Sequence, residues 1–291
     1  MNGIMTALLT PFHDDGTLNE KGLREVVRHN IDEMQVNGLY VGGSTGESFL
    51  MDEGNRKDLL EIVKDEAGND VTLIAQIGSL NIEEAVRLGN KAKELGYDAL
   101  SAITPYYYKF SFQEIKAYYQ RITEETEHPM IVYSIPALTG TQITIKDYGE
   151  LLSLPNVIGV KYSDTNLSKL AKLKELYPDK VFFGGADDML LQLIVSGADG
   201  AIGSTYSIIG KEANELFESL QKSDLENARN LQKQMNKVIS ILEEVGVYQS
   251  TKHVLKQLGV DAGYMKFPFR EITEDEKKQV DKIVGILTLN K

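Results

Sequence analysis

The stretch Ser196-Gly197-Ala198-Asp199-Gly200-Ala201 decides the fold, because it places glycine and aspartate between a segment of helical period and a short apolar run. The same arrangement occurs at Leu95-Gly96-Tyr97-Asp98-Ala99-Leu100 and, with asparagine and glycine, at Val36-Asn37-Gly38-Leu39-Tyr40. Glycine accepts the left-handed conformation that ends a helix, and the apolar residues that follow begin a strand. These stretches are therefore predicted to be turns that lead from a helix into the next strand.

Outward from these turns, short β-prone apolar runs alternate with polar segments of helical period along the chain. The predicted strands cover residues 4–9, 39–41, 72–77, 99–103, 131–135, 157–162, 181–183 and 201–202. The predicted helices cover residues 20–34, 55–64, 82–95, 112–123, 145–152, 167–176, 189–195 and 209–221. Eight strand–helix pairs in one chain favour an α/β fold of the closed (β/α)8 type, the TIM barrel. The alternative, a doubly wound open sheet, would usually begin with a nucleotide-type glycine-rich turn, which Thr10-Pro11-Phe12-His13 is not.

The chain continues beyond the eighth pair with helical patterns. Residues 225–245 form a long amphipathic pattern, and further helices are expected at 249–258 and 274–287. A length of 291 residues fits one α/β barrel, and no low-complexity stretch marks a linker. We therefore expect a single domain over 1–291, with the barrel over 1–222 and a C-terminal helical extension over 223–291 that packs on the barrel.

Composition and charge exclude several classes of function. Hydrophobic residues make up 42% and charged residues 25% of the chain, as in ordinary globular proteins. The N-terminus does not read as a signal peptide and no run of about 18 apolar residues occurs, so we expect a cytoplasmic protein without a membrane span. A formal net charge of −12 argues against nucleic-acid or anionic-membrane partners. The absence of cysteine excludes disulfides and thiolate catalysis.

In a barrel, the carboxyl ends of the strands build the active site, and Lys161 closes the apolar run Val157-Ile158-Gly159-Val160. Such a lysine either points its amine into the barrel mouth as a catalytic group or forms a structural salt bridge. A Schiff-base lysine attacks as the neutral amine, so its pKa must fall from about 10.4 to near 7, which costs roughly 4.6 kcal/mol against the charged form. Burial in a barrel supplies shifts of that size.

Two further features follow or occupy predicted strands. Tyr133 lies on the fifth strand, where its phenol can shuttle protons beside Lys161 or serve as an ordinary core residue. The turn Gly42-Gly43-Ser44-Thr45-Gly46 offers backbone N–H groups and two hydroxyls at a helix start, which suits a carboxylate. It lacks the Lys-Ser/Thr ending of a P-loop, so phosphate binding is the weaker alternative.

The remaining polar clusters are less specific. Asp187-Asp188 either caps the following helix or receives substrate hydroxyls, with a hard cation as a third alternative. The four histidines show no metal-ligand spacing and are interpreted as surface or hydrogen-bonded residues; they are His13, His29, His128 and His253. We therefore expect no metal, and the Schiff-base chemistry considered for Lys161 requires no organic cofactor.

Several spaced motifs, in order, resemble the N-acetylneuraminate lyase branch of the superfamily that also holds dihydrodipicolinate synthase. The resemblance runs over nearly the whole chain. Its motifs are Ala7-Leu8-Leu9-Thr10-Pro11-Phe12, Gly42-Gly43-Ser44-Thr45-Gly46-Glu47, Ser101-Ala102-Ile103-Thr104-Pro105-Tyr106-Tyr107-Tyr108, Tyr133-Ser134-Ile135-Pro136, Gly159-Val160-Lys161, Ser196-Gly197-Ala198-Asp199-Gly200 and Gly203-Ser204-Thr205.

The resemblance implies a role for each matching residue. Lys161 corresponds to the Schiff-base lysine, Tyr133 to the proton-transfer tyrosine, and Ser44 with Thr45 to the binders of the pyruvyl carboxylate. Tyr107 matches a family tyrosine that approaches a neighbouring subunit's site, which implies at least a dimer, and the resemblance itself suggests a homotetramer of paired dimers. The part of the pocket that holds the sugar chain would be lined by Ser163, Gly185, Asp187, Asp188 and Ser204.

The branch within the superfamily rests on fewer residues. The synthase pattern commonly carries an arginine where this chain has Leu138, and it tends to have two threonines in place of Ser44-Thr45. Three residues depart from the usual lyase pattern, namely Ser134 for asparagine, Ser163 for threonine and Asp188 for glutamate.

These residues together predict a Schiff-base lyase that reversibly cleaves N-acetylneuraminate to N-acetylmannosamine and pyruvate. One alternative is another pyruvate-dependent aldolase of the superfamily, acting on 2-keto-3-deoxy sugar acids or as a dihydrodipicolinate synthase. The other is a non-catalytic barrel that senses a keto acid.

Overall fold

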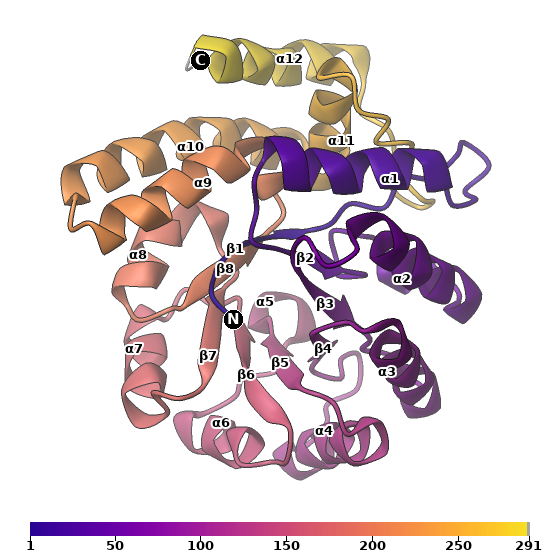
Figure 1. Cartoon of the computed structure of the whole chain (residues 1–291), viewed down its shortest axis with the longest axis vertical. Helices are drawn as coiled ribbons and strands as arrows, with labels where there is room; N and C mark the ends of the chain where they lie inside the picture. Colours follow the sequence, from indigo (N-terminus) through magenta and orange to yellow (C-terminus); the bar gives the residue numbers. More distant parts are fainter. Residues whose placement is uncertain (290–291) are drawn as a thin grey trace.

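The structure, a computed structural model, describes residues 1–289 and contains a closed barrel of eight parallel strands in the order β1 to β8 (Figure 1). The strands are β1 (Gly3–Ala7), β2 (Gly38–Val41), β3 (Thr72–Gln76), β4 (Ala99–Ile103), β5 (Met130–Ser134), β6 (Val157–Tyr162), β7 (Val181–Gly184) and β8 (Gly200–Gly203). Strand β8 pairs with β1 and so closes the sheet. The predicted (β/α)8 barrel is confirmed.

Helices surround the barrel, and most of them fall where helical periodicity predicts them. Those in the barrel are α1 (Glu20–Arg28), α2 (Glu53–Ala67), α3 (Ile82–Leu95), α4 (Phe112–Thr126), α5 (Pro136–Thr139), α6 (Ile145–Leu152), α7 (Leu167–Leu176), α8 (Leu190–Val195) and α9 (Tyr206–Gln221). The helix predicted over 20–34 changes at its end to a π-helical turn, His29–Glu33. The one-turn helix α5 was not predicted, because four residues are too few to show a period.

Two of the three turns named from the sequence have the predicted conformation. Gly96 and Gly197 take φ values of 79° and 101°, in the region that favours glycine. The third turn also leads from a helical segment into a strand, but its left-handed residue is Gln35 (φ 55°), so only the conformation expected of its glycine was wrong. Gly38 serves a packing purpose instead, because a Cβ there would lie 2.7 Å from the carbonyl oxygen of Thr72 on the neighbouring strand.

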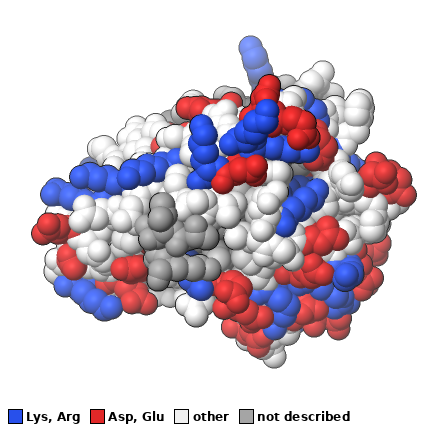
Figure 2. Space-filling view, turned by 90° about the horizontal axis from the view of Figure 1, so that it is seen from above, with Lys and Arg blue, Asp and Glu red and all other residues white. Residues whose placement is uncertain are grey.

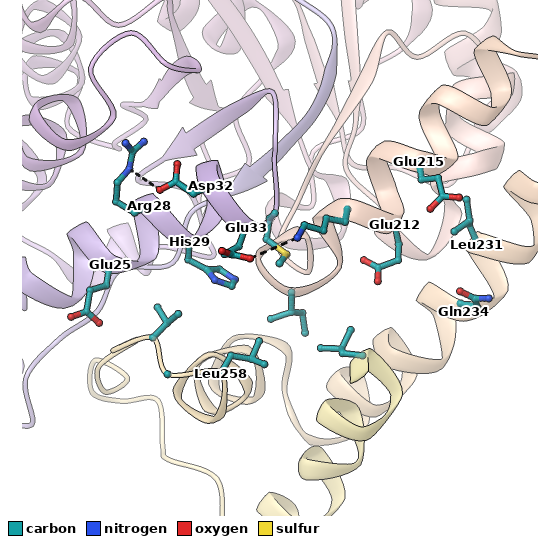
Figure 3. A pocket seen from close by; sticks show the side chains of 16 residues that line it. Glu25, Arg28, His29, Asp32, Glu33, Glu212, Glu215, Leu231, Gln234 and Leu258 are labelled. Carbon is teal, nitrogen blue, oxygen red and sulfur yellow. Dashed lines mark ion pairs between the residues drawn. The ribbon is translucent and has the colours of Figure 1, made fainter. Parts of the chain in front are cut away.

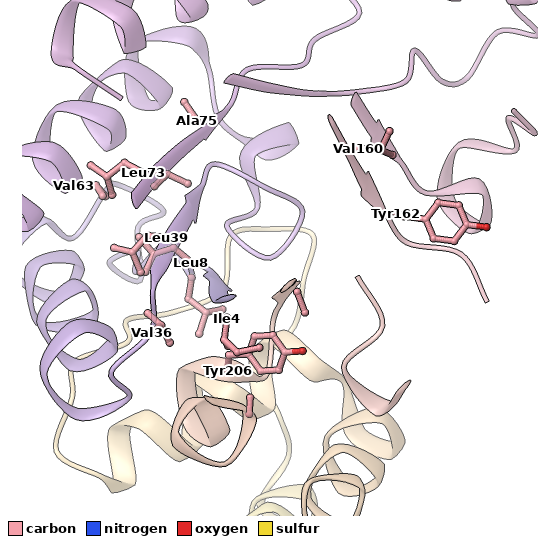
Figure 4. Packing of buried hydrophobic residues seen from close by; sticks show 14 of the residues in the cluster. Ile4, Leu8, Val36, Leu39, Val63, Leu73, Ala75, Val160, Tyr162 and Tyr206 are labelled. Atoms are coloured by element: carbon pink, nitrogen blue, oxygen red, sulfur yellow. The ribbon is translucent and has the colours of Figure 1, made fainter. Parts of the chain in front are cut away.

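The core has an inner and an outer layer. Between strands and helices lies the outer layer, of which Figure 4 shows part, including Leu39, Leu73 and Tyr206. The inner layer fills the barrel with side chains that alternate along the strands. It consists of Met5, Ala7, Tyr40, Ile74, Ala99, Ile103, Ile131, Tyr133, Phe183 and Ile202.

The C-terminal extension contains α10 (Leu225–Val245), α11 (Val247–Gln257) and α12 (Glu274–Leu289). Helix α10 lies along α9, and α11 and α12 pack beside them at one side of the barrel (Figure 1). A single cluster of buried apolar side chains joins the barrel to this extension and runs from Ile4 to Ile283. Residues 290 and 291 of the expected domain lie outside the described residues.

Acidic and basic side chains are interspersed over the face shown in Figure 2. Within residues 1–289, no helix combines the length and apolar character needed to cross a membrane.

Candidate active site

Lys161 lies on β6 with its side chain inside the barrel and is only 5% exposed. Its Nζ sits between two aromatic rings, 4.1 Å from the centre of the Tyr133 ring and 4.2 Å from that of Tyr40. Burial lowers the pKa of Lys161 to about 7, and the charge of Asp187 opposes this shift. The amine is therefore present in substantial amounts as the neutral nucleophile near pH 7.

Tyr40 was missed by the sequence reasoning. It lies on β2 inside the barrel, and its ring meets that of Tyr133 edge-on, at 5.9 Å between centres. Its hydroxyl donates to Ser101 Oγ (3.0 Å), which donates to the carbonyl of Ile131 (2.9 Å). The alternation of side chains along the second strand places Tyr40 on the inner face, and this was the signal available.

Tyr133 is the register partner of Lys161, since β5 and β6 are hydrogen-bonded neighbours. Burial raises the pKa of Tyr133, while the nearby hydroxyls of Ser44 and Ser163 partly offset the rise. The phenol is thus a proton donor at neutral pH. The buried Ser44 hydroxyl has no hydrogen-bond partner of good geometry among the described residues, so it can form a hydrogen bond with a ligand.

The turn after β2 brings Ser44 and Thr45 to the carboxyl end of the barrel. Thr45 Oγ1 and Ser204 Oγ are hydrogen-bonded at 2.7 Å, which joins this turn to the loop after β8. Within the described residues, the backbone N–H groups of Ser44 and Thr45 donate to no protein acceptor. The predicted helix start is only a one-turn 3-10 helix, Ser48–Leu50. Two free N–H groups beside a free hydroxyl form a suitable cradle for a carboxylate.

Asp187 does not cap the helix that follows it, so that interpretation was wrong. Its Oδ2 accepts hydrogen bonds from the backbone N–H (2.9 Å) and the hydroxyl (2.7 Å) of Thr205 at the start of α9. Burial raises the pKa of Asp187, and the two Thr205 hydrogen bonds oppose this. Asp188 beside it is exposed.

Two glycines make room for this arrangement. A Cβ on Gly203 would lie 2.0 Å from Asp187 Oδ1, and a Cβ on Gly185 would lie 1.9 Å from Ser163 Oγ. Larger residues at either position would push these polar side chains away. The residues predicted for the sugar-binding part of the pocket are thus brought to neighbouring loops after β6, β7 and β8.

Tyr107 is not part of this cluster within one chain. It follows β4 in a left-handed conformation (φ 72°), is 84% exposed, and packs its ring on that of Tyr108 at 5.0 Å.

The histidines have the structural roles expected for them. His29 Nε2 is bonded to the carbonyl of Ser207, and His253 Nε2 to Asp281. No group of three or more His, Asp or Glu side chains within residues 1–289 is arranged to hold a metal ion.

A cavity of about 920 Å³ lies away from Lys161, between α1 and the helices α9 to α12 (Figure 3). Acidic side chains such as Glu25 and Glu215 line it. Two ion pairs, Arg28–Asp32 and Lys211–Glu33, form between residues of the lining. It contains none of the predicted site residues.

Comparison with known proteins decides the family. The model of the "Dihydrodipicolinate synthetase family" matches residues 1–287. The chain belongs to this family. The resemblance found in the sequence is therefore confirmed.

Similar family members carry the name N-acetylneuraminate lyase. That of Clostridium perfringens is 46% identical over 285 residues, covering 97% of this chain and 99% of the relative. The structure of CdNal from Clostridium difficile in complex with mannosamine has a TM-score of 0.96 at 43% identity and covers 97% of this chain and 98% of that one. The N-acetylneuraminate lyase from Fusobacterium nucleatum, solved with pyruvate, has a TM-score of 0.94 at 46% identity and covers 98% and 96%.

Proposed function

We propose that this family member is a carbon–carbon lyase that reversibly cleaves N-acetylneuraminate to N-acetylmannosamine and pyruvate through a Schiff base on Lys161. The observation that carries the proposal is the buried amine of Lys161, with a pKa of about 7, beside Tyr133. The choice of substrate is supported by N-acetylneuraminate lyases that share 46–48% sequence identity with this protein over nearly the whole chain.

The site residues divide the chemistry between them. The neutral amine of Lys161 adds to the keto carbon, Tyr133 protonates the resulting oxyanion, and loss of water gives the protonated imine. The C–C bond then breaks with its electron pair drawn into the imine, which becomes an enamine, while the sugar hydroxyl loses its proton towards Tyr133. Protonation of the enamine and hydrolysis release pyruvate and the free amine.

Each end of the substrate has a counterpart in the site. The unpartnered hydroxyl of Ser44 and the free N–H groups of Ser44 and Thr45 suit the carboxylate of the pyruvyl part. The polyhydroxy chain is assigned to Ser163, Gly185, Asp187, Asp188 and Ser204. The relatives solved with pyruvate and with mannosamine support a small-molecule substrate with these two ends.

Leu138 favours this reaction over that of dihydrodipicolinate synthase. It is 63% exposed on α5 and offers no guanidinium to a second substrate carboxylate. Other pyruvate-dependent aldolases, acting on 2-keto-3-deoxy sugar acids, remain the alternative.

We further propose a homotetramer in which Tyr107, exposed in one chain, reaches the site of a neighbour. We treat the chain as a single domain and as cytoplasmic, and the mechanism requires neither metal nor organic cofactor. The shared apolar core between barrel and extension supports the single domain.

The test is reduction with borohydride in the presence of N-acetylneuraminate, with pyruvate in parallel, followed by peptide mass spectrometry. A pyruvyl adduct on Lys161 is expected from both, and none in Lys161→Arg. An adduct from pyruvate alone would shift the function to another aldolase substrate. The absence of any adduct would refute the Schiff base and favour a keto-acid sensor.

A further inference from the structure

The C-terminal extension reaches into the barrel mouth through Lys252 of α11. Its Nζ donates to Glu47 Oε1 (2.6 Å), to the carbonyl of Thr10 (2.8 Å) and to the carbonyl of Tyr264 (2.6 Å). The side chains of Lys252 and Glu47 are only 3% and 0% exposed. All three protons of the ammonium are therefore used, and the pair is shielded from water.

Glu47 ends the turn that carries Ser44 and Thr45. It holds a left-handed conformation (φ 58°), and its N–H donates to the carbonyl of Ser44 (3.0 Å). Its second carboxylate oxygen, Oε2, accepts from the backbone N–H of Lys266 (2.7 Å). Both carboxylate oxygens of Glu47 thus accept hydrogen bonds from the C-terminal extension. Its backbone N–H, in contrast, is bonded within the turn, to the carbonyl of Ser44.

Stability alone does not account for this pair. Replacing a buried ion pair by apolar side chains of similar volume is often neutral or stabilising, because desolvation offsets most of the Coulomb gain. What the pair supplies is a fixed position, since four hydrogen bonds from separate segments of the chain meet at its two side chains.

We propose that Lys252 and Glu47 are positioning residues that set the turn Gly43–Ser48 in the geometry that receives the substrate carboxylate. The C-terminal extension then contributes directly to selectivity for keto acids. This inference rests on the proposed function, because it assumes that the turn binds the pyruvyl carboxylate.

A separate set of contacts indicates that α10 also positions a loop of the pocket, namely the loop after β7 that carries Asp187 and Asp188. Gln232 Nε2 donates to the carbonyl of Asp187 and Asn236 Nδ2 to that of Asp188, both at 3.1 Å. Gln232 Oε1 accepts from the N–H of Leu191 (2.8 Å). We infer that Gln232 and Asn236 position the loop after β7 for the sugar part of the substrate.

The first proposal is tested with Glu47→Gln/Lys252→Met, which removes both charges and leaves no unpaired buried ion. There are two readouts. One is the melting temperature, and the other is the ligand concentration that gives half-maximal borohydride-trapped imine, measured with pyruvate and with neutral pyruvamide. We expect a folded protein with a moderately lower melting temperature, because the carbonyls of Thr10 and Tyr264 lose their donor. The preference for pyruvate over pyruvamide should fall roughly tenfold, the loss expected when a charged group loses one well-placed hydrogen bond.

The control is Lys256→Met, one turn further along α11, where the lysine is exposed and stacks on Tyr264. This variant should keep the wild-type preference. If the double variant also keeps it, the positioning role is overturned. If the wild type forms no adduct with pyruvate, the proposed function itself has failed, which is a distinct result.

For α10, Asn236→Ala should raise KM for N-acetylneuraminate about fivefold to tenfold, the cost of one lost hydrogen bond, and leave pyruvate imine formation unchanged. Equal losses in both assays would indicate a general structural role and overturn the second inference.

Discussion

Lys161 and Tyr133 are register partners on adjacent strands, and the amine lies 4.1 Å from the centre of the phenol ring. The ladder between β5 and β6 thus fixes the proposed nucleophile and the proposed proton donor relative to each other. Strands hold such a geometry more rigidly than loops do.

The rate of imine formation with pyruvate should depend on pH through Lys161. Its pKa is lowered to about 7 by burial, so the reactive neutral amine increases as pH rises through 7 and reaches a plateau above. Stopped-flow or trapping rates from pH 5.5 to 9 measure this. An inflection near 10 would mean that burial does not activate the amine.

Replacing Lys161 should stabilise the protein. Between pH 7 and 10.5 the unfolded chain binds a proton that the native chain does not, so the burial penalty is full below pH 7 and fades as pH rises. Lys161→Met should therefore raise the free energy of unfolding near pH 6.5, with about 5 kcal/mol as the ceiling.

Denaturant unfolding at pH 6.5 and 9.5 tests this, and the gain should be much smaller at the higher pH. Lys172→Met, at an exposed position on α7, serves as the control. A gain that does not change with pH would point to packing as its source.

Tyr133→Phe removes the hydroxyl and keeps the ring that packs beside Lys161. We expect kcat to fall by about 10²- to 10⁴-fold, the usual contribution of a positioned proton donor. The borohydride adduct with pyruvate should still form, but more slowly. A kcat within threefold of the wild type would assign Tyr133 to the core alone.

Mixed oligomers test the role of Tyr107, which is 84% exposed and whose ring meets that of Tyr108 edge-on. Lys161→Arg and Tyr107→Phe should each be inactive or strongly impaired alone. Unfolding and refolding them together should restore activity, because some sites then combine Lys161 of one subunit with Tyr107 of the other. No restoration in confirmed hetero-oligomers would show that both residues act within one chain.

Much of the fold could be predicted because its signals are local. Strands 99–103 and 157–162 and helices 82–95 and 167–176 match the structure to the residue, since period and turn chemistry act over a few neighbours. Residues at strand ends, such as Lys161 and Ser44, were identifiable because parallel strands of a barrel bring their carboxyl ends together. The left-handed conformation of Gln35 and the π-helical turn at His29 could not be predicted in this way, because packing overrides local preference there.

The sequence by itself determined the barrel, the helical extension and the residues at the mouth. Only the tertiary structure decided that the ring of Tyr40 lies beside the amine of Lys161. The same is true of two hydrogen bonds: Thr205 donates to Asp187, and Lys252 donates to Glu47, which is 205 residues away in the sequence. The reason is physical: periodicity records which face of an element is buried, whereas the partner met on that face depends on how distant elements pack.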